Sequence, residues 1–265
     1  MNLTLLKADA RRNLPLFVII VYVMLLYFTV IAYMFDPSDS SSLSSMMELL
    51  PQGLMSSFGF GEVATNLTDF IVSYYYGFLV FVFPMIYCII TANQLVAKMV
   101  DNGSFAYLLM APVSRCRIIV TKGVFLLLAI AALFSILYTA GVAICRFLFG
   151  NMLNEAVFLQ LNVNAALLTM AVGMICFFYA CYFNESRQAL SFSAGVNIGF
   201  LLLFMLGGVS EKSEFLKQFS IYSLLDTDAI LQGSGAAGVC LLLLLATMLL
   251  FAASVFVFHR KNLPI

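Results

Sequence analysis

The stretch LPLFVIIVYVMLLYFTVIAYMF, residues 14–35, decides the fold class of this chain. It carries no charged side chain, and as a helix it exceeds the roughly 20 residues needed to cross the hydrocarbon core of a bilayer. Because no water reaches that core, the backbone must satisfy its own hydrogen bonds, which requires a helix. The preceding Lys7, Arg11 and Arg12 resemble the start of a signal peptide, but the apolar stretch is longer than an h-region of about 7–15 residues. No small-x-small cleavage site follows it, so we expect a retained transmembrane helix.

Five further apolar stretches of comparable length follow. Hydrophobic residues make up 63% of the 265 residues, charged residues only 10%, and the mean hydropathy is +1.04. Soluble domains are about half apolar and a quarter charged, so this composition excludes an ordinary soluble domain. The sequence predicts one all-α transmembrane domain over residues 1–265. It consists of an amphipathic lead-in at 1–13 and six spans near 14–35, 70–96, 122–149, 164–183, 189–208 and 236–259.

The basic residues predict the orientation. If both termini are cytoplasmic, ten of the 13 basic residues lie on the cytoplasmic side and only Arg146, Lys212 and Lys217 lie outside. This bias follows the positive-inside rule. We expect Lys122 at the inner end of its span and Arg146 paired with an outer acid or reaching the headgroups. On the outer side, residues 214–219 and 223–231 are each predicted to form a short interfacial helix.

The chain lacks the sequence motifs of several classes of binding protein and enzyme. It contains neither G-x-x-x-x-G-K-[ST] nor G-x-G-x-x-G after a strand, so we expect it to bind no nucleotide itself. No basic tail points to a nucleic-acid partner. The cysteines have no C-x-x-C spacing, and the only histidine, His259, lies at the inner end of the last span. We therefore predict no catalytic residues, no metal site and no cofactor bound by this chain.

The longest inner loop, residues 98–121, has the pattern of a short amphipathic helix. Phe105, Leu108 and Leu109 follow one another at i, i+3 and i+4, which places them on one apolar face. Pro112 ends this helix, and Ser114 can cap the next one. From the residues alone, the apolar face could equally lie on the lipid surface or bind a partner inside the cell.

The segment DNGSFAYLLMAPVSR, residues 101–115, resembles the inner loop of ABC-2-type transporter permeases, the membrane subunits of ATP-binding cassette transporters, including type V exporters. That loop usually has an acid, Gly-Thr, a Leu-Leu pair and Pro-hydrophobic-Ser-Arg, with a lysine several residues later. The ending FHRKNLPI, residues 258–265, is similar to the aromatic, basic, Arg-Asp-Leu-Pro ending of the same family. This chain departs from the pattern by having Asn-Gly-Ser at 102–104 and Asn262 in place of the acid.

The resemblance implies an ABC-2-type permease fold and a coupling helix that docks in a groove of a separate ATPase. Two ATPase subunits, which bind ATP and magnesium, and two permeases would form the transporter. The second permease would be another copy of this chain or a related one. Carried over to this sequence, the docking residues are Gly103, Phe105, Leu108, Leu109, Pro112, Ser114 and Arg115.

Two spans carry polar and small residues that suggest either helix packing or a substrate path. In the second span, Ser73, Gly77, Pro84, Tyr87, Thr91 and Gln94 fall on one face of an uninterrupted helix. In the fifth span, Ser193 and Asn197 share a face, and Gly195-x-x-x-Gly199 allows two helices to approach closely. The candidate path residues are Ser73, Gly77, Tyr87, Thr91, Gln94, Ser193 and Asn197.

From these observations we expect the permease subunit of an exporter in a bacterial plasma membrane, with no ATPase site of its own. Its substrate class is left open, with a hydrophobic or amphipathic cargo favoured by the apolar spans and short loops. Two alternatives stay open: an integral membrane enzyme acting on lipids, and a receptor or immunity protein that does not transport. The enzyme would need clustered ionisable residues at the interface, whereas the receptor could share the permease fold.

Overall fold

The computed structural model describes residues 3–35, 66–105, 108, 114–209, 211–225, 227 and 236–261. Its regular elements are helices, and six stretches of helix are long and apolar enough to cross a membrane. They are α1 (Leu3–Met34), α5 with α6 (Leu79–Leu95 and Ala97–Asp101), α8 (Arg115–Phe149), α9 (Glu155–Tyr182), α10 (Ser186–Val209) and α12 (Ala236–Arg260). The predicted all-helical class with six candidate spans is confirmed for the described residues.

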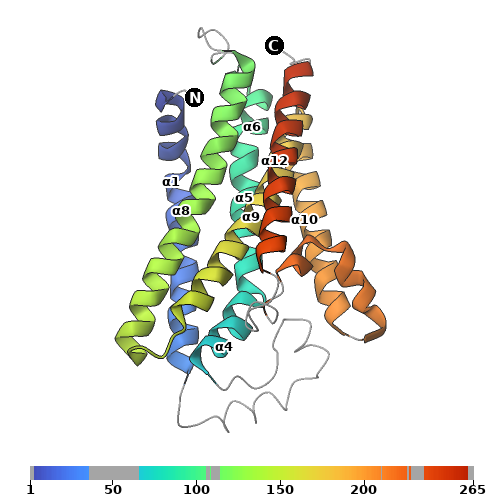
Figure 1. Cartoon of the computed structure of the whole chain (residues 1–265). Helices are drawn as coiled ribbons and strands as arrows, with labels where there is room; N and C mark the ends of the chain where they lie inside the picture. Colours follow the sequence, from blue (N-terminus) through green and yellow to red (C-terminus); the bar gives the residue numbers. More distant parts are fainter. Residues whose placement is uncertain are drawn as a thin grey trace.

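The six helices form a bundle with an inner and an outer group. Within the most apolar part of each helix, 56–67% of the residues of α5, α8 and α9 are buried, against 17–22% for α1, α10 and α12. α9 packs against α5, α8, α10 and α12, so it lies at the centre. The two chain ends, α6 and the beginning of α8 lie at one end of the bundle, and α4 (Leu67–Ile71) lies at the other (Figure 1).

Three helices extend beyond the predicted spans, among them α9, which begins at Glu155 and so nine residues before the predicted start at residue 164. The amphipathic lead-in predicted at 1–13 is, from Leu3 onward, continuous with the first span in α1, despite Pro15. α8 begins at Arg115, seven residues before the predicted start at Lys122, and Ser114 Oγ accepts a hydrogen bond from the Arg117 amide at 3.4 Å. This confirms the Ser114 cap. The apolar stretches alone underestimate the lengths of these helices, because the polar ends of the helices pack against neighbouring helices.

The second predicted span is interrupted. It consists of α4, a π-helical turn η1 (Val72–Tyr76), and α5, which begins after Phe78, whose backbone (φ −134°, ψ −47°) leaves the helical region. A π turn contains an extra residue, so side chains before and after it no longer follow a single 3.6-residue period. The continuous face predicted from Ser73 to Gln94 is therefore wrong.

At the turn between α8 and α9, the ion pair predicted for Arg146 is present. Arg146 Nη2 lies 2.6 Å from Glu155 Oε1, and Arg146 Nε donates to the same oxygen at 2.8 Å. The pair links the end of α8 to the beginning of α9. Because both side chains are exposed, we expect it to orient this turn more than to stabilise the fold.

After α10 the chain folds back along that helix (Figure 1). The 3₁₀ segment η2 (Glu211–Phe219) contains the predicted helix at 214–219. The second 3₁₀ segment, η3 (Ile221–Leu224), overlaps only the start of the stretch predicted at 223–231, most of which lies outside the described residues. Ser220 Oγ donates to the Phe200 carbonyl at 2.7 Å, which fixes the returning chain to α10.

This return depends on a glycine. A Cβ atom at Gly207 would lie 2.8 Å from the Lys217 backbone nitrogen and 2.6 Å from its Cγ. We predict that Gly207→Ala lowers the free energy of unfolding by about 1–3 kcal/mol, because overpacking against backbone is not relieved by rotamer changes. The measurement is thermal unfolding in detergent, with Gly238→Ala as the control because a Cβ there meets nothing within 4 Å. Equal melting of the two variants would contradict the close approach.

Candidate functional site

The residues around the α6–α8 connection form a group of polar and aromatic contacts that joins several helices. We call it the loop junction and define it by Asp9, Met99, Ser104, Phe105, Lys122 and Phe258. Gly103 opens the connection with φ +68°, a conformation that glycine adopts readily. Ser104 Oγ then donates to the Met99 carbonyl at 3.3 Å, which holds the first residues of the connection against α6.

Phe105 is anchored inside this chain. Its side chain is only 2% exposed, and its ring lies 5.2 Å from that of Phe258 near the end of α12. Leu108 is partly buried against the same core, whereas Leu109 and Pro112 lie outside the described residues. The prediction of an apolar face with only lipid or a partner to cover it is therefore wrong for Phe105. Sequence reasoning missed this because it could not place the end of α12 beside the connection.

A buried ion pair forms the other half of the loop junction. Lys122 Nζ lies 3.2 Å and 3.4 Å from the two carboxylate oxygens of Asp9, and 3.3 Å from Met99 Sδ. Lys122 has no exposed surface and Asp9 is 5% exposed. The sequence predicted Lys122 only at the end of its span, and did not predict that the side chain is buried in an ion pair. Because both groups are almost completely withdrawn from water, each needs the opposite charge of the other to offset the cost of its burial.

The ion pair connects three elements. Asp9 belongs to α1, Met99 to α6 and Lys122 to α8. Asn13 lies one turn after Asp9 in α1, and its amide nitrogen donates to the Asp9 carbonyl at 2.8 Å. The Asn13 side-chain oxygen is buried without a hydrogen-bond partner among the described residues. The only sequence signal for this site was an isolated acid and a lysine beside apolar stretches, where ionisable residues are rare.

The C-terminal segment contributes a second anchor. Lys261 Nζ donates to the carbonyls of Cys181 at 2.9 Å and Phe183 at 2.6 Å, where α9 ends. The last carbonyls of a helix lack intrahelical donors, and a cation there also interacts well with the helix dipole. Burial lowers the pKa of Lys261 to about 8. The end of α12 is therefore joined both to α9 and, through Phe258, to the α6–α8 connection.

The candidate path residues do not share one surface. Tyr87 is buried with its ring 6.0 Å from that of Phe17 in α1. Ser193 and Asn197 instead bond to α9: Ser193 Oγ donates to the Cys176 carbonyl at 3.4 Å, and the Asn197 amide lies 3.2 Å from Cys176 Sγ. Thr91 is buried, and the remaining three are half-buried: Ser73, Gly77 and Gln94.

Asn197 has one unsatisfied group. Its side-chain nitrogen also donates to the Ser193 carbonyl at 2.7 Å, but its oxygen is buried without a partner among the described residues. The Tyr222 hydroxyl in η3 is likewise buried without a partner among those residues, and its ring packs 5.0 Å from that of Phe81. Sequence reasoning missed Tyr222, because nothing in the outer loop indicated that it returns into the bundle.

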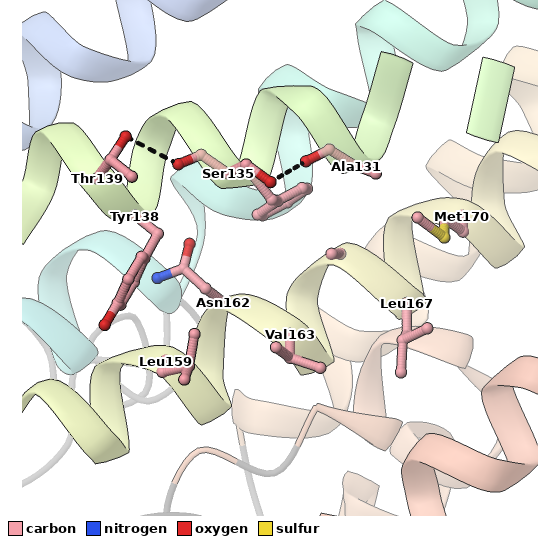
Figure 2. Close-up of a pocket in the computed structure, with 11 residues that line it drawn as sticks. Ala131, Ser135, Tyr138, Thr139, Leu159, Asn162, Val163, Leu167 and Met170 are labelled. Carbon is pink, nitrogen blue, oxygen red and sulfur yellow. Dashed lines mark hydrogen bonds between the residues drawn. The ribbon is translucent and has the colours of Figure 1, made fainter. Parts of the chain in front are cut away.

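A hollow of about 450 Å³ lies between α8 and α9 (Figure 2). The polar side chains that line it donate their hydrogen bonds largely within their own helices. Ser135 donates to the Ala131 carbonyl at 2.8 Å, and Asn162 to the Phe158 carbonyl at 3.0 Å. The hollow therefore suits an apolar group better than a charged one. None of the candidate path residues lines it. The lining residues are Ala131, Phe134, Ser135, Tyr138, Thr139, Leu159, Asn162, Val163, Ala166, Leu167 and Met170.

Neither a protein-family model nor a curated protein matches this chain. Among the described residues, no three His, Cys, Asp or Glu side chains are grouped as metal ligands would be. What the described residues do bring together is the loop junction. It joins the α6–α8 connection to α1, α8 and α12, because each of these helices contributes a side chain to it.

Proposed function

We propose that this chain is the transmembrane permease subunit of an ATP-binding cassette exporter with an ABC-2-type fold, in a bacterial plasma membrane. ATP would be hydrolysed by separate ATPase subunits. Both termini and the α6–α8 connection would be cytoplasmic, as the bias of basic residues predicts. The proposal fits the placement of the beginnings of α1 and α8 and the ends of α6 and α12 at one end of the bundle (Figure 1).

The observation that carries the proposal is a contact between the two segments on which the family resemblance rests. Phe105 belongs to the inner-loop segment and Phe258 to the C-terminal segment, and their rings pack together at 5.2 Å. The two segments are 153 residues apart between these positions, yet they form one junction. A loop that receives a force from a partner must be joined to the helices that move, and this contact provides such a connection.

One of the residues predicted to dock the ATPase, Phe105, receives a different role in this proposal. Because Phe105 is buried within the chain, we assign it to anchoring the connection and leave docking to the exposed Gly103, Ser114 and Arg115, with Leu108 partly buried. Leu109 and Pro112 stay predicted docking residues. ATPase closure would shift the connection, and the bundle would respond only through differences in contact between its two arrangements.

A feature of α10 also supports pairing with a second permease copy. A Cβ atom at Gly195 or at Gly199 on α10 would meet nothing within 4 Å. Within the described part of the chain no other helix uses the Gly-x-x-x-Gly motif, which permits close approach of another helix. The apolar hollow between α8 and α9 is consistent with a hydrophobic or amphipathic cargo. The alternatives, a lipid-modifying enzyme and a non-transporting receptor, are outcomes of the following test.

We predict that the full chain, purified from its native membrane in mild detergent, retains a P-loop ATPase in a complex of two copies of each subunit. Arg115→Glu should reduce the recovered ATPase by roughly tenfold, which corresponds to about 1.4 kcal/mol. Arg115 is exposed in the first turn of α8, where an acid is favourable to the helix dipole, so this change should not weaken the helix. Recovery is measured by quantitative mass spectrometry.

Arg187→Glu is the matched control, because Arg187 is also exposed in the first turn of a spanning helix, α10. It should leave the ATPase recovery unchanged. If no ATPase accompanies the wild-type chain, the transporter proposal is wrong and the receptor or enzyme alternatives take its place. If both variants lose the ATPase equally, binding depends on overall charge and the docking assignment fails.

A further inference from the structure

The N-terminal part of α1 presents a cationic face that the loop junction does not use. Lys7 and Arg11 are exposed and lie one helical turn apart. A hollow of about 690 Å³ borders them. The described residues that line it are Thr4, Lys7, Ala8, Ala10, Arg11 and Leu14.

The acid of this segment is turned away from that face. Asp9 lies between Lys7 and Arg11 in the sequence, but its carboxylate is buried against Lys122 of α8. Within the part of the chain that the structure describes, neither Lys7 nor Arg11 takes part in an ion pair. The ion pair therefore removes the negative charge that would otherwise compensate these two cations.

The same face becomes apolar along the helix. Leu14 and Val18 follow Lys7 by seven and eleven residues, so they lie on its side of α1, and each is 54% exposed. With a rise of about 1.5 Å per residue, Leu14 lies roughly 10 Å along the helix from Lys7. A cationic surface that passes into an apolar one over this distance matches the boundary between phosphate headgroups and acyl chains.

We propose that this face of α1 binds an anionic phospholipid. Its phosphate would contact Lys7 and Arg11, and one acyl chain would lie along Leu14 and Val18. A zwitterionic lipid would bind more weakly because its ammonium group faces the same cations. The proposal depends on the six helices spanning a membrane, but not on transport or on an ATPase.

The test uses the purified full chain reconstituted in nanodiscs of phosphatidylcholine with a minor fraction of phosphatidylglycerol. Native mass spectrometry then counts the phosphatidylglycerol that stays bound. Lys7→Gln with Arg11→Gln should lower its apparent affinity roughly 25-fold, because each basic residue near an anionic lipid contributes about fivefold. Lys98→Gln with Arg187→Gln removes the same charge from two other exposed positions and should leave the retention unchanged.

A second arm separates a lipid site from a site for free phosphate. Inorganic phosphate and glycerol phosphate at millimolar concentration should not displace the bound phosphatidylglycerol, because they lack the acyl chain that contacts Leu14 and Val18. Displacement by either would overturn the lipid assignment. The proposal would also fail if both double variants lost lipid equally, which indicates general charge attraction, or if neither lost any.

Discussion

Replacing Asp9 by alanine is expected to lower the free energy of unfolding by about 3–5 kcal/mol, the cost typical of breaking a buried ion pair on one side. The change leaves the Lys122 ammonium, which has no exposed surface, with the Met99 sulfur as its remaining hydrogen-bond partner among the described residues. Such a group either stays charged at a high cost or loses its proton. The loss should appear as a lower unfolding temperature of the full chain in detergent.

The double variant Asp9→Ala with Lys122→Met distinguishes the contribution of the ion pair to stability from its contribution to coupling between the α6–α8 connection and the bundle. It removes both charges and keeps the length of the lysine stem, so it should recover most of the stability, because apolar replacement of a buried pair is often neutral. If the pair also transmits movement of the α6–α8 connection, this stable variant should retain its ATPase partner but lose substrate-stimulated hydrolysis. A double variant as unstable as Asp9→Ala would show that the pair is not the cause of the loss.

Phe105→Ala is expected to release the α6–α8 connection from the bundle. Truncating a buried phenylalanine costs about 3–5 kcal/mol in a packed core, and here the loss should be local because Phe105 anchors a connection between helices. Hydrogen exchange of residues 102–105 should increase. Phe258→Ala should have the same effect, and the double variant should cost less than the sum of the single changes, since both remove one ring contact.

The same pair of variants distinguishes anchoring from docking. If Phe105 bound directly in an ATPase groove, Phe105→Ala would abolish recovery of the ATPase whereas Phe258→Ala would leave it intact. Under the anchoring assignment, both variants weaken recovery to a similar degree, because both free the connection. Phe147→Ala is the control, since Phe147 is 90% exposed and should affect neither exchange nor recovery.

Features within one helix, or between helices adjacent in the chain, could be predicted. The Ser114 cap depends on residues three positions apart, and the Arg146–Glu155 pair on two helix ends joined by a short turn. The interruption of the second span could not be predicted. The π turn at Val72–Tyr76 forms in a stretch without proline or charged residues, so no helix-breaking residue marks it in the sequence.

The helical class of this chain could be predicted from its residues alone, because stretches such as 14–35 are too long and too apolar to satisfy their backbone in any other way within a membrane. The number of candidate spans followed from the same stretches. The residues of the candidate site, in contrast, became apparent only from the packing of the helices. Asp9 meets Lys122 across 113 residues of chain, and Phe105 meets Phe258 at the far end of α12. Helical periodicity assigns each side chain to a face, but the neighbour of that face depends on how all six helices pack together.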